Sequence, residues 1–241
     1  MSIWSIADLH LCLGVPSKTM EIFGAHWHAY VSRLEHNWRA VVQPHDLVLL
    51  AGDISWAMHL KEAVIDFAWI AALPGTKVMI RGNHDYWWNS RKQVRAVLPP
   101  SIHVIHNDAF EWHTCSVGGT RLWETGEYGY GADGPRSEED EKIYTRELGR
   151  LERSLQAMQH VKRLVMTHYP PIGAQHQATR VSRLLSQYGV CDCVFGHVHT
   201  AASAQQSLVE AYLPHVTLDG VCYHLTSSDV LAFHPKCIMR V

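Results

Sequence analysis

The sequence predicts an α/β fold in which a layered β-sheet core is covered by helices on the outside. Short apolar runs typical of buried strands alternate with segments whose apolar residues recur at helical spacing. The middle and the end of the chain are rich in further short strands. The chain has 241 residues, which fits one domain with a full hydrophobic core. We therefore expect residues 1–241 to form a single domain.

Strands and helices alternate in the first part of the chain. Each strand is predicted from a short apolar run, and each helix from apolar spacing that stops at proline, as at Pro44, Pro74 and Pro99. In order, we expect a strand over 2–7, a helix over 26–42, a strand over 46–50, a helix over 59–73, a strand over 77–80 and a helix over 90–98.

The second part of the chain has a β-rich middle and tail. Ser137 followed by acidic residues is typical of a helix start, and Gly189 is placed to end a helix. In order, we expect strands over 102–105, 114–117 and 120–123, a loop over 124–137, a helix from 138 to about 159, a strand over 163–167, a helix over 177–188, a strand over 191–195, and two or three strands from 216 onwards.

Composition excludes several classes of protein. The formal net charge of −2 argues against a protein that binds a nucleic-acid polymer, because such domains carry a basic patch. No apolar run approaches the ~20 residues of a membrane span, and no signal peptide is recognised. The six cysteines are scattered, with only Cys191 and Cys193 close together. We expect free thiols in a cytoplasmic protein with no membrane partner.

Five expected strands end in polar clusters that make little sense as packing. Because ligand sites of α/β folds lie off the carboxyl ends of strands, strands of one sheet would bring these clusters to one edge. The clusters are Asp8 with His10, Asp53, Asn83 with His84 and Asp85, His168, and His197 with His199.

The chemistry of these side chains indicates a metal centre. Mixed imidazole and carboxylate ligands suit Mn, Fe or Zn, and also Ni, rather than Ca or Mg. Seven ligands are too many for one ion, but they suffice for two ions that share a carboxylate. Two such ions would attract a phosphate and lower the pKa of a bridging water. The seven are Asp8, His10, Asp53, Asn83, His168, His197 and His199.

Taken together and in order, the blocks resemble the calcineurin-like metallophosphoesterase superfamily. Its pattern is Asp-x-His, Gly-Asp, Gly-Asn-His-Asp, His and Gly-His-x-His, and all five blocks occur between Asp8 and His199. The stretches Gly-Asp-Ile-Ser-Trp-Ala-Met, Gly-Asn-His-Asp-Tyr-Trp-Trp and Gly-Thr-Arg-x-Trp also resemble a bacterial branch of predicted phosphohydrolases without a settled substrate. The resemblance implies a four-layer α/β/β/α sandwich, with two mixed sheets flanked by helices, and a two-metal site.

The resemblance also implies a role for each ligand. It assigns one ion to Asp8, His10, Asp53 and His199, and the other to Asp53, Asn83, His168 and His197, so that Asp53 bridges. His84 would face the scissile phosphate and Asp85 would orient it. One departure concerns the Gly-Asp block, which many relatives follow with a second Asp. Here Ser55 and Trp56 follow, so no extra acid is expected to support that turn.

The function expected from this set is hydrolysis of a phosphate ester by a metal-bound hydroxide, with His84 stabilising the transition state or protonating the leaving oxygen. A small phosphodiester is the first expectation for the substrate. Phosphomonoester or phosphoprotein hydrolysis is the alternative. Nuclease action and a non-catalytic interaction scaffold are less favoured, because no basic stripe is present and every ligand position is filled.

Several flanking residues leave their roles open. Trp56, Trp87 and Trp88 could stack on a substrate group or pack beneath the loops, and Cys12 could approach the metals. Arg81, Arg121 and Arg136 could clamp a phosphate or form surface salt bridges. Ordinary surface or core roles are expected for the histidines outside the blocks, namely His106, His176, His224 and His234.

Overall fold

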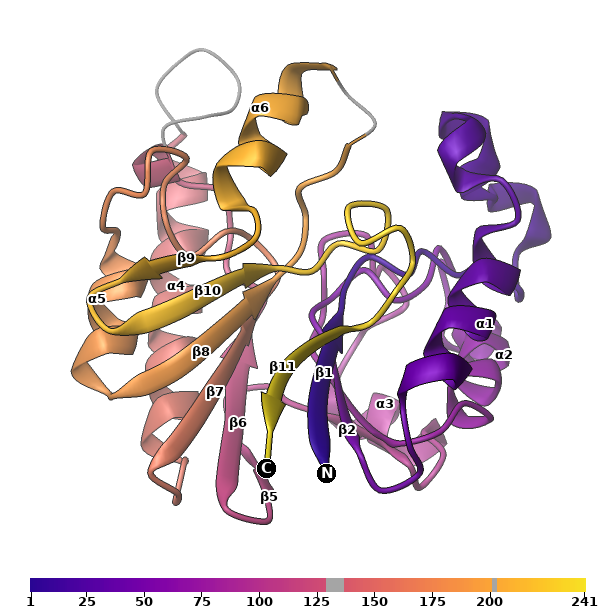
Figure 1. Ribbon diagram of the computed structural model, residues 1–241, viewed down its shortest axis with the longest axis horizontal. Helices are drawn as coiled ribbons and strands as arrows, with labels where there is room; N and C mark the ends of the chain where they lie inside the picture. Colours follow the sequence, from indigo (N-terminus) through magenta and orange to yellow (C-terminus); the bar gives the residue numbers. More distant parts are fainter. Residues whose placement is uncertain (129–136, 201–202) are drawn as a thin grey trace.

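The computed structural model describes residues 1–128, 137–200 and 203–241. Two mixed β-sheets pack face to face in it (Figure 1). Within these ranges, the first sheet has the strand order β11 (Lys236–Arg240), β1 (Ser2–Ile6), β2 (Leu47–Leu50), β3 (Thr76–Met79) and β4 (Ile102–Val104). The second has the order β5 (Phe110–Trp112), β6 (Cys115–Thr120), β7 (Lys162–Thr167), β8 (Val190–Phe195), β10 (Val221–Leu225) and β9 (Val216–Leu218).

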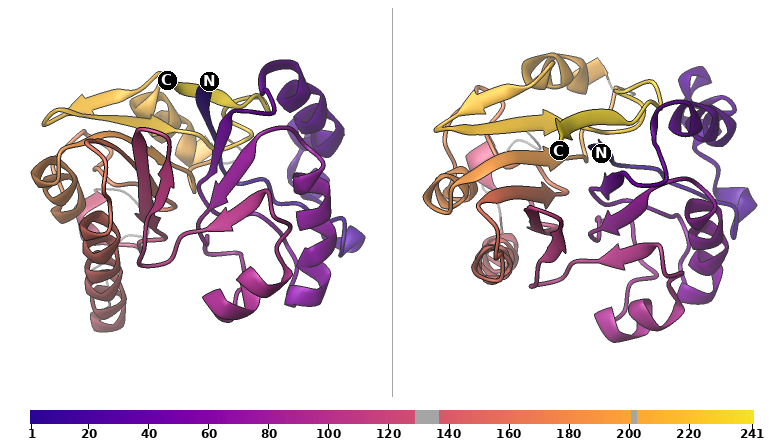
Figure 2. Two further views of the ribbon diagram at one scale, coloured as in Figure 1. Left: turned by 90° about the horizontal axis from the view of Figure 1, so that it is seen from below. Right: turned by 60° about the horizontal axis from the view of Figure 1, so that its bottom comes forward.

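Helices cover the outer face of each sheet, as the two further views show (Figure 2). The first sheet is covered by α1 (Tyr30–Val41), α2 (Leu60–Ala71) and α3 (Arg91–Val97). The second is covered by α4 (Glu138–Gln156), α5 (Arg180–Gln187) and α6 (Ser203–Tyr212). The predicted four-layer α/β/β/α sandwich is thereby confirmed. Among these helices, none is long and apolar enough to cross a membrane.

Strand β2 shows how the apolar runs specify the layers. All four of its residues are buried, and successive side chains of a strand point to opposite faces. Leu47 and Leu49 belong to the apolar cluster between the two sheets. Val48 and Leu50 belong to the cluster beneath the helices. A strand that is buried on both faces has to be apolar throughout. The continuous apolar run in the sequence is the pattern that predicted β2.

The strand predicted over 114–117 is confirmed as the first half of β6, which continues to Thr120, whereas the separate strand predicted over 120–123 is wrong. The hairpin partner of β6, strand β5, was not predicted. Gly118 and Gly119 lie between the two expected strands, but in the structure both are inside β6. Neighbouring segments pack so closely there that a side chain would not fit. A Cβ on Gly118 would lie 2.5 Å from Cε of Met158, and one on Gly119 would lie 2.2 Å from the carbonyl oxygen of Met166. Glycine within a strand here permits close approach of neighbouring segments.

The helices agree with the expected ranges apart from their ends. The segment before α1 forms short 3₁₀ turns, η1 (Pro16–Lys18), η2 (Met20–Phe23) and η3 (Ala25–Trp27), so the helix expected from residue 26 begins at Tyr30. Ser137 caps α4 with a capping box to Asp140, as its sequence indicated. Helix α6 was not predicted, and the tail contains the three strands β9, β10 and β11.

Candidate metal centre

The five polar clusters follow five parallel strands. Within the first sheet β1, β2 and β3 run parallel, and within the second β7 and β8 run parallel. The carboxyl ends of the two sheets meet, so all seven predicted ligands come together. Both sheets contribute to one site. Backbone hydrogen bonds connect them there, and in one of these the N–H of Ala7 donates to the carbonyl of Thr226.

One group of donors surrounds the first expected ion. Donor atoms of Asp8, His10 and His199 all lie within 4.8 Å of one another. Nε2 of His199 is 3.7 Å from Oδ1 of Asp8. Nε2 of His10 is 3.8 Å from Oδ2 of Asp53. Asp8, His10 and His199, with Asp53 beside His10, offer nitrogen and carboxylate oxygen, which is a donor set that suits a divalent transition metal.

A second group of donors converges on the amide oxygen of Asn83. That oxygen lies 2.6 Å from Nε2 of His168 and 3.0 Å from Nδ1 of His197. Nε2 of His168 is also 3.5 Å from Oδ2 of Asp53. The same carboxylate oxygen therefore faces His10 on one side and His168 on the other. This is the position that a bridging ligand requires.

The second nitrogen of two imidazoles is held by protein oxygen, which leaves the first nitrogen for a ligand role. Nδ1 of His168 lies 3.0 Å from the carbonyl oxygen of Ala51. Nδ1 of His199 lies 2.9 Å from Oδ1 of Asp229. In both residues Nε2 points to the carboxylates of the centre. Such outer hydrogen bonds fix the ring orientation of metal-ligating histidines.

Burial and neighbouring charges shift the pKa values of the ligand cluster. Burial raises the pKa of Asp8 to about 6 and lowers that of His10 to about 3. Burial lowers the pKa of His168 too, but the Asp53 carboxylate, aided by Asp8 and the carbonyl of Ala51, outweighs burial and raises this pKa to about 9. Burial would raise the pKa of Asp53, yet the nearby imidazoles hold it below its usual value. A buried carboxylate pair among imidazoles is a site that favours added positive charge.

The backbone at the ligand positions is strained. Four of the ligands have a positive φ, namely Asp8 at 56°, His10 at 46°, Asp53 at 52° and His197 at 70°. Residues with a side chain rarely adopt this left-handed conformation, and where they do the surrounding structure has to maintain it. Such strain gathers at functional sites. At these four positions the left-handed backbone accompanies a ligand side chain that lies at the shared centre.

The glycines of the sequence blocks allow the close approach of these loops. A Cβ on Gly82 would lie 2.1 Å from Oδ1 of Asp53, and one on Gly196 would lie 2.4 Å from Oδ2 of Asp8. A Cβ on Gly52 would meet the ring of His168 at 2.7 Å. Each glycine therefore makes room for a ligand that comes from a different block.

The expected contact between Asp85 and His84 is corrected by the structure. The Asp85 carboxylate accepts the backbone N–H groups of Ile54, Ser55 and Gly82, together with Nε1 of Trp87 at 3.0 Å. Nδ1 of His84 has no hydrogen-bond partner in the part of the chain that the structure describes. Asp85 is thus a buried acceptor for four donors, which come from the loop after β2 and from its own loop after β3. It positions the turn that carries His84 and does not hold the imidazole.

The turn after the Gly-Asp block is also supported by acids, contrary to expectation. Asp66 of α2 accepts the hydroxyl of Ser55 and, at 2.9 Å, the N–H of Leu13. Asp85 accepts the N–H groups of Ile54 and Ser55 on the same turn. Acids from other elements thus take the place of the missing local one.

Asp229 belongs to the candidate site, although the sequence did not predict it. Its Oδ1 contacts Nδ1 of His199 at 2.9 Å, and its Oδ2 accepts the N–H of Thr200 at 2.8 Å. Burial lowers the pKa of His199, but this contact together with the carboxylates of Asp8 and Asp53 outweighs burial and raises the pKa to about 9. Asp229 lies after β10, outside every sequence block. The available signal in the sequence was the polar run Thr226, Ser227 and Ser228 just before it, directly after the residues of β10.

We expect Asp229→Asn to weaken metal binding by about 10- to 100-fold, because an outer partner of a metal-ligating histidine is lost. Isothermal titration of the stripped protein with manganese measures this change. The matched control is Glu111→Gln, which breaks a 3.4 Å contact to Nε2 of His160 away from the ligand cluster. An unchanged affinity in Asp229→Asn, or an equal loss in the control, would contradict the role.

The flanking aromatic residues divide into two groups. Trp87 and Trp88 are buried in the core beneath the helices of the first sheet, which confirms the packing role for both. The ring of Trp56 stacks on His10 at 4.8 Å and lies 4.6 Å from the ring of His84. Trp56 therefore borders the centre. Cys12 contacts the hydroxyl of Tyr30 at 3.5 Å and belongs to neither donor group.

The three flanking arginines have different surroundings. Arg121 lies 3.9 Å from Glu147, stacks over Trp123 at 4.4 Å and is mostly buried. Arg81 lines a small cavity with Arg121 and Glu147. Arg136 lies outside the described residues. The role of Arg81 and Arg121 in holding phosphate stays a prediction.

The remaining histidines contact groups outside the ligand cluster, as expected. His176 bonds the carbonyl of Ala211, and His234 lies 3.2 Å from the amide of Asn37. His224 pairs with Asp192. His106 lines the cavity beside Arg81.

Comparison with known families agrees with this geometry. A family model described as calcineurin-like phosphoesterase matches residues 1–201. The chain belongs to the calcineurin-like phosphoesterase family. As a member of this family it is a metal-dependent hydrolase of phosphate esters. The match includes all seven ligands, but it ends before Asp229.

Two solved structures resemble this calcineurin-like phosphoesterase. One is the phosphopantetheinyl hydrolase from Mycobacterium tuberculosis, with a TM-score of 0.62 and 12% sequence identity over 100% of this chain and 96% of that one. At this identity the likeness concerns the fold. The other is a protein of unknown function from Aquifex aeolicus, with a TM-score of 0.47 and 15% identity over 98% of this chain and 95% of that chain. No curated protein matches the chain.

Proposed function

We propose that the chain is a binuclear phosphoesterase that hydrolyses a small phosphodiester. The observation that carries the proposal is the Asp53 carboxylate, whose Oδ2 faces Nε2 of His10 at 3.8 Å and Nε2 of His168 at 3.5 Å. A carboxylate shared by two groups of donors fits two ions. Asp8, His10, Asp53 and His199 would hold one, and Asp53, Asn83, His168 and His197 the other. Mn, Fe and Zn suit these ligands best, and Ni also fits.

Ions held by these ligands would supply positive charge to the phosphate and acidify the attacking water. The chain's own residues set the geometry around that chemistry. The N–H of His84 donates to Oδ1 of Asp53 at 2.8 Å, so the His84 backbone is fixed against the bridging residue. Burial lowers the pKa of its imidazole. His84 is thereby placed to donate a hydrogen bond to the leaving oxygen or to a phosphate oxygen.

Two features support an ester with a sizeable organic group, as the proposed diester has. Trp56 offers an aromatic ring beside His10 and His84, which suits the organic group of an ester. One solved structure of similar fold is, by its name, a phosphopantetheinyl hydrolase. A phosphomonoester or phosphoprotein substrate is the alternative. The formal net charge of −2 supports a small substrate over a nucleic-acid polymer.

The proposal also covers the domain organisation and the location of the protein. Because the ligands come from both sheets, we propose that residues 1–241 act as one domain. All six cysteines are free, which supports a location in a reducing cytoplasm.

The test compares bis(p-nitrophenyl) phosphate with p-nitrophenyl phosphate, using metal-stripped protein to which manganese is returned. We expect hydrolysis only after manganese is restored, with a higher kcat/KM for the diester. A preference for the monoester would replace the diesterase by a phosphatase. Metal-restored protein that hydrolyses neither ester would contradict catalysis of these esters. Metal binding that persists without turnover would then favour the scaffold.

A further inference from the structure

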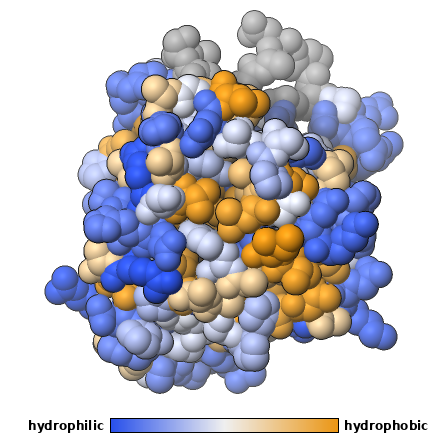
Figure 3. All heavy atoms as spheres, turned by 90° about the vertical axis from the view of Figure 1, so that its right-hand side faces the viewer, coloured by the Kyte–Doolittle hydropathy of each residue, from blue (hydrophilic) through white to orange (hydrophobic). Residues whose placement is uncertain are grey.

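An apolar cavity lies next to the candidate metal centre. It has a volume of about 250 Å³ and is lined by Lys18, Ile22 and Phe23 of the N-terminal 3₁₀ segment and by Trp56 and Tyr86 of the loops after β2 and β3. The segment stands at the right-hand side of Figure 1, and the space-filling view of that side shows hydrophobic side chains gathered among hydrophilic ones (Figure 3).

The lining side chains are unusually exposed for their type. Ile22 is 75% exposed, Phe23 is 53% exposed and Tyr86 is 49% exposed. Contiguous apolar surface around a concave site is a mark of ligand binding, because its hydration is unfavourable until a ligand covers it. The segment that presents these residues is held in place. Glu21 accepts the N–H of Ala29 at 2.9 Å, and Thr19 caps the turn η2.

The cavity is continuous with the residues expected to act on the phosphate. Trp56 lines the cavity, and its ring is 4.8 Å from that of His10 and 4.6 Å from that of His84. The ring of Tyr86, on the other wall, is 6.0 Å from that of His84. A phosphate at the ligand cluster would thus have the cavity on its His84 side. With His84 on the leaving oxygen, one of the two roles proposed for it, this is the side of the leaving group.

We infer that the cavity binds the organic group of the leaving alcohol, and that this group is apolar or aromatic. The inference rests on the proposed function and specifies its substrate class. Three aromatic rings and an isoleucine offer faces for stacking and apolar contact. Lys18 is the charged residue of the lining, and its amine donates to the carbonyl of Trp56 at 3.4 Å. A positive charge there favours an anionic phosphoester over a cationic ligand.

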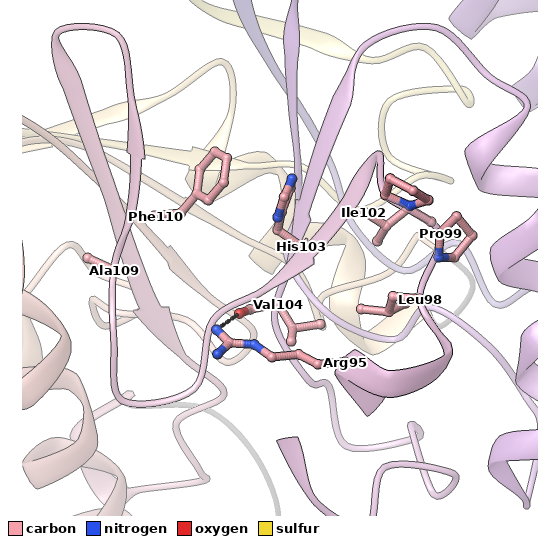
Figure 4. A pocket seen from close by; sticks show the side chains of 9 residues that line it. Arg95, Leu98, Pro99, Ile102, His103, Val104, Ala109 and Phe110 are labelled. Atoms are coloured by element: carbon pink, nitrogen blue, oxygen red, sulfur yellow. Dashed lines mark hydrogen bonds between the residues drawn. The ribbon is translucent and has the colours of Figure 1, made fainter. Parts of the chain in front are cut away.

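A second cavity provides the control. It has a volume of about 260 Å³ and lies between β4 and β5, where Phe110 and His103 project toward each other (Figure 4). None of its lining residues is a predicted ligand. Arg95 there is already bonded to the carbonyl of Val104 at 3.1 Å and to Asp108 at 2.8 Å. Phe110→Ala therefore removes the same side chain as Phe23→Ala from a cavity outside the site.

The experiment measures the Kd of methylphosphonate and benzylphosphonate on manganese-loaded protein by isothermal titration. Both carry the same anionic group and neither is hydrolysed as an ester, so their ratio reports only the organic group. We expect benzylphosphonate to bind roughly tenfold more tightly to the wild type. Phe23→Ala should reduce this preference to about threefold or less. Phe110→Ala should keep the wild-type preference.

The outcomes separate the two proposals. Equal binding of both phosphonates to the wild type, or an unchanged preference in Phe23→Ala, would overturn the cavity as the leaving-group site and leave the phosphoesterase standing. Loss of the preference in Phe110→Ala as well would overturn it too, since the effect would then be general. Binding of neither phosphonate, despite bound manganese, would count against the phosphate site itself and remove the basis for both proposals.

Discussion

Asp53→Asn should lower kcat/KM for the preferred ester by about 10³-fold or more. A metal centre contributes several kcal/mol to the transition state, and each 1.36 kcal/mol is a tenfold change in rate. Asp53 is placed between the two donor groups, so its loss affects both. The neutral amide also removes negative charge from a cluster of four imidazoles. Steady-state kinetics with manganese restored measure the effect.

The matched control for this substitution lies at the other end of the same strand. Asp46 precedes β2 and is also buried, and it accepts the N–H groups of Ser2 at 2.7 Å and Gln43 at 2.9 Å. Asp46→Asn should cost some stability and keep the kcat/KM of the folded fraction. Circular dichroism checks that both variants fold. Activity in a folded Asp53→Asn protein within a few-fold of wild type would rule out the bridging role.

His84→Ala should reduce turnover by about 10²–10⁴-fold, the usual loss when a group that transfers a proton or stabilises the transition state is removed. Metal content should not change. The backbone N–H of residue 84 donates to Oδ1 of Asp53 at 2.8 Å, and this hydrogen bond does not involve the side chain. The alanine variant therefore retains it. Elemental analysis and steady-state kinetics on the same preparation test both statements together.

A half-buried histidine elsewhere gives the comparison for His84. His103 lines the cavity between β4 and β5, and His103→Ala should leave turnover near wild type. Turnover of His84→Ala within a few-fold of wild type would exclude the catalytic role. A loss of activity that parallels a loss of metal would instead make His84 a residue that positions the ligands. The expected pattern is low turnover with full metal content.

The ligand set could be predicted from sequence because each ligand directly follows a strand that is easily recognised. Val78, Met79 and Ile80 form an apolar run, and Asn83 follows a short turn. The covalent order of the chain thus places the side chain at the carboxyl edge. The glycines belong to the same local signal, since Gly82 and Gly196 leave room for ligands of other blocks.

The outer support of the ligands could not be predicted, because it is formed between segments that are distant in the chain. Asp229 reaches His199 from the loop after β10, and Asp66 reaches Ser55 from α2. Asp85 is next to His84 in sequence, yet it bonds the turn at Ile54 and Ser55. Proximity in sequence was a poor guide in that case, since several buried N–H donors are stronger partners for a carboxylate than one imidazole.

The most direct test of the central claim counts the metal ions bound by each chain. Stripped protein is titrated with manganese, and bound metal is measured by elemental analysis beside Asp53→Asn. A two-ion centre bridged by Asp53 predicts two ions per wild-type chain at saturation, with fewer in the variant, and activity that rises as the ions bind. Saturation at one ion per chain, or equal stoichiometry in both proteins, would contradict a centre bridged by Asp53.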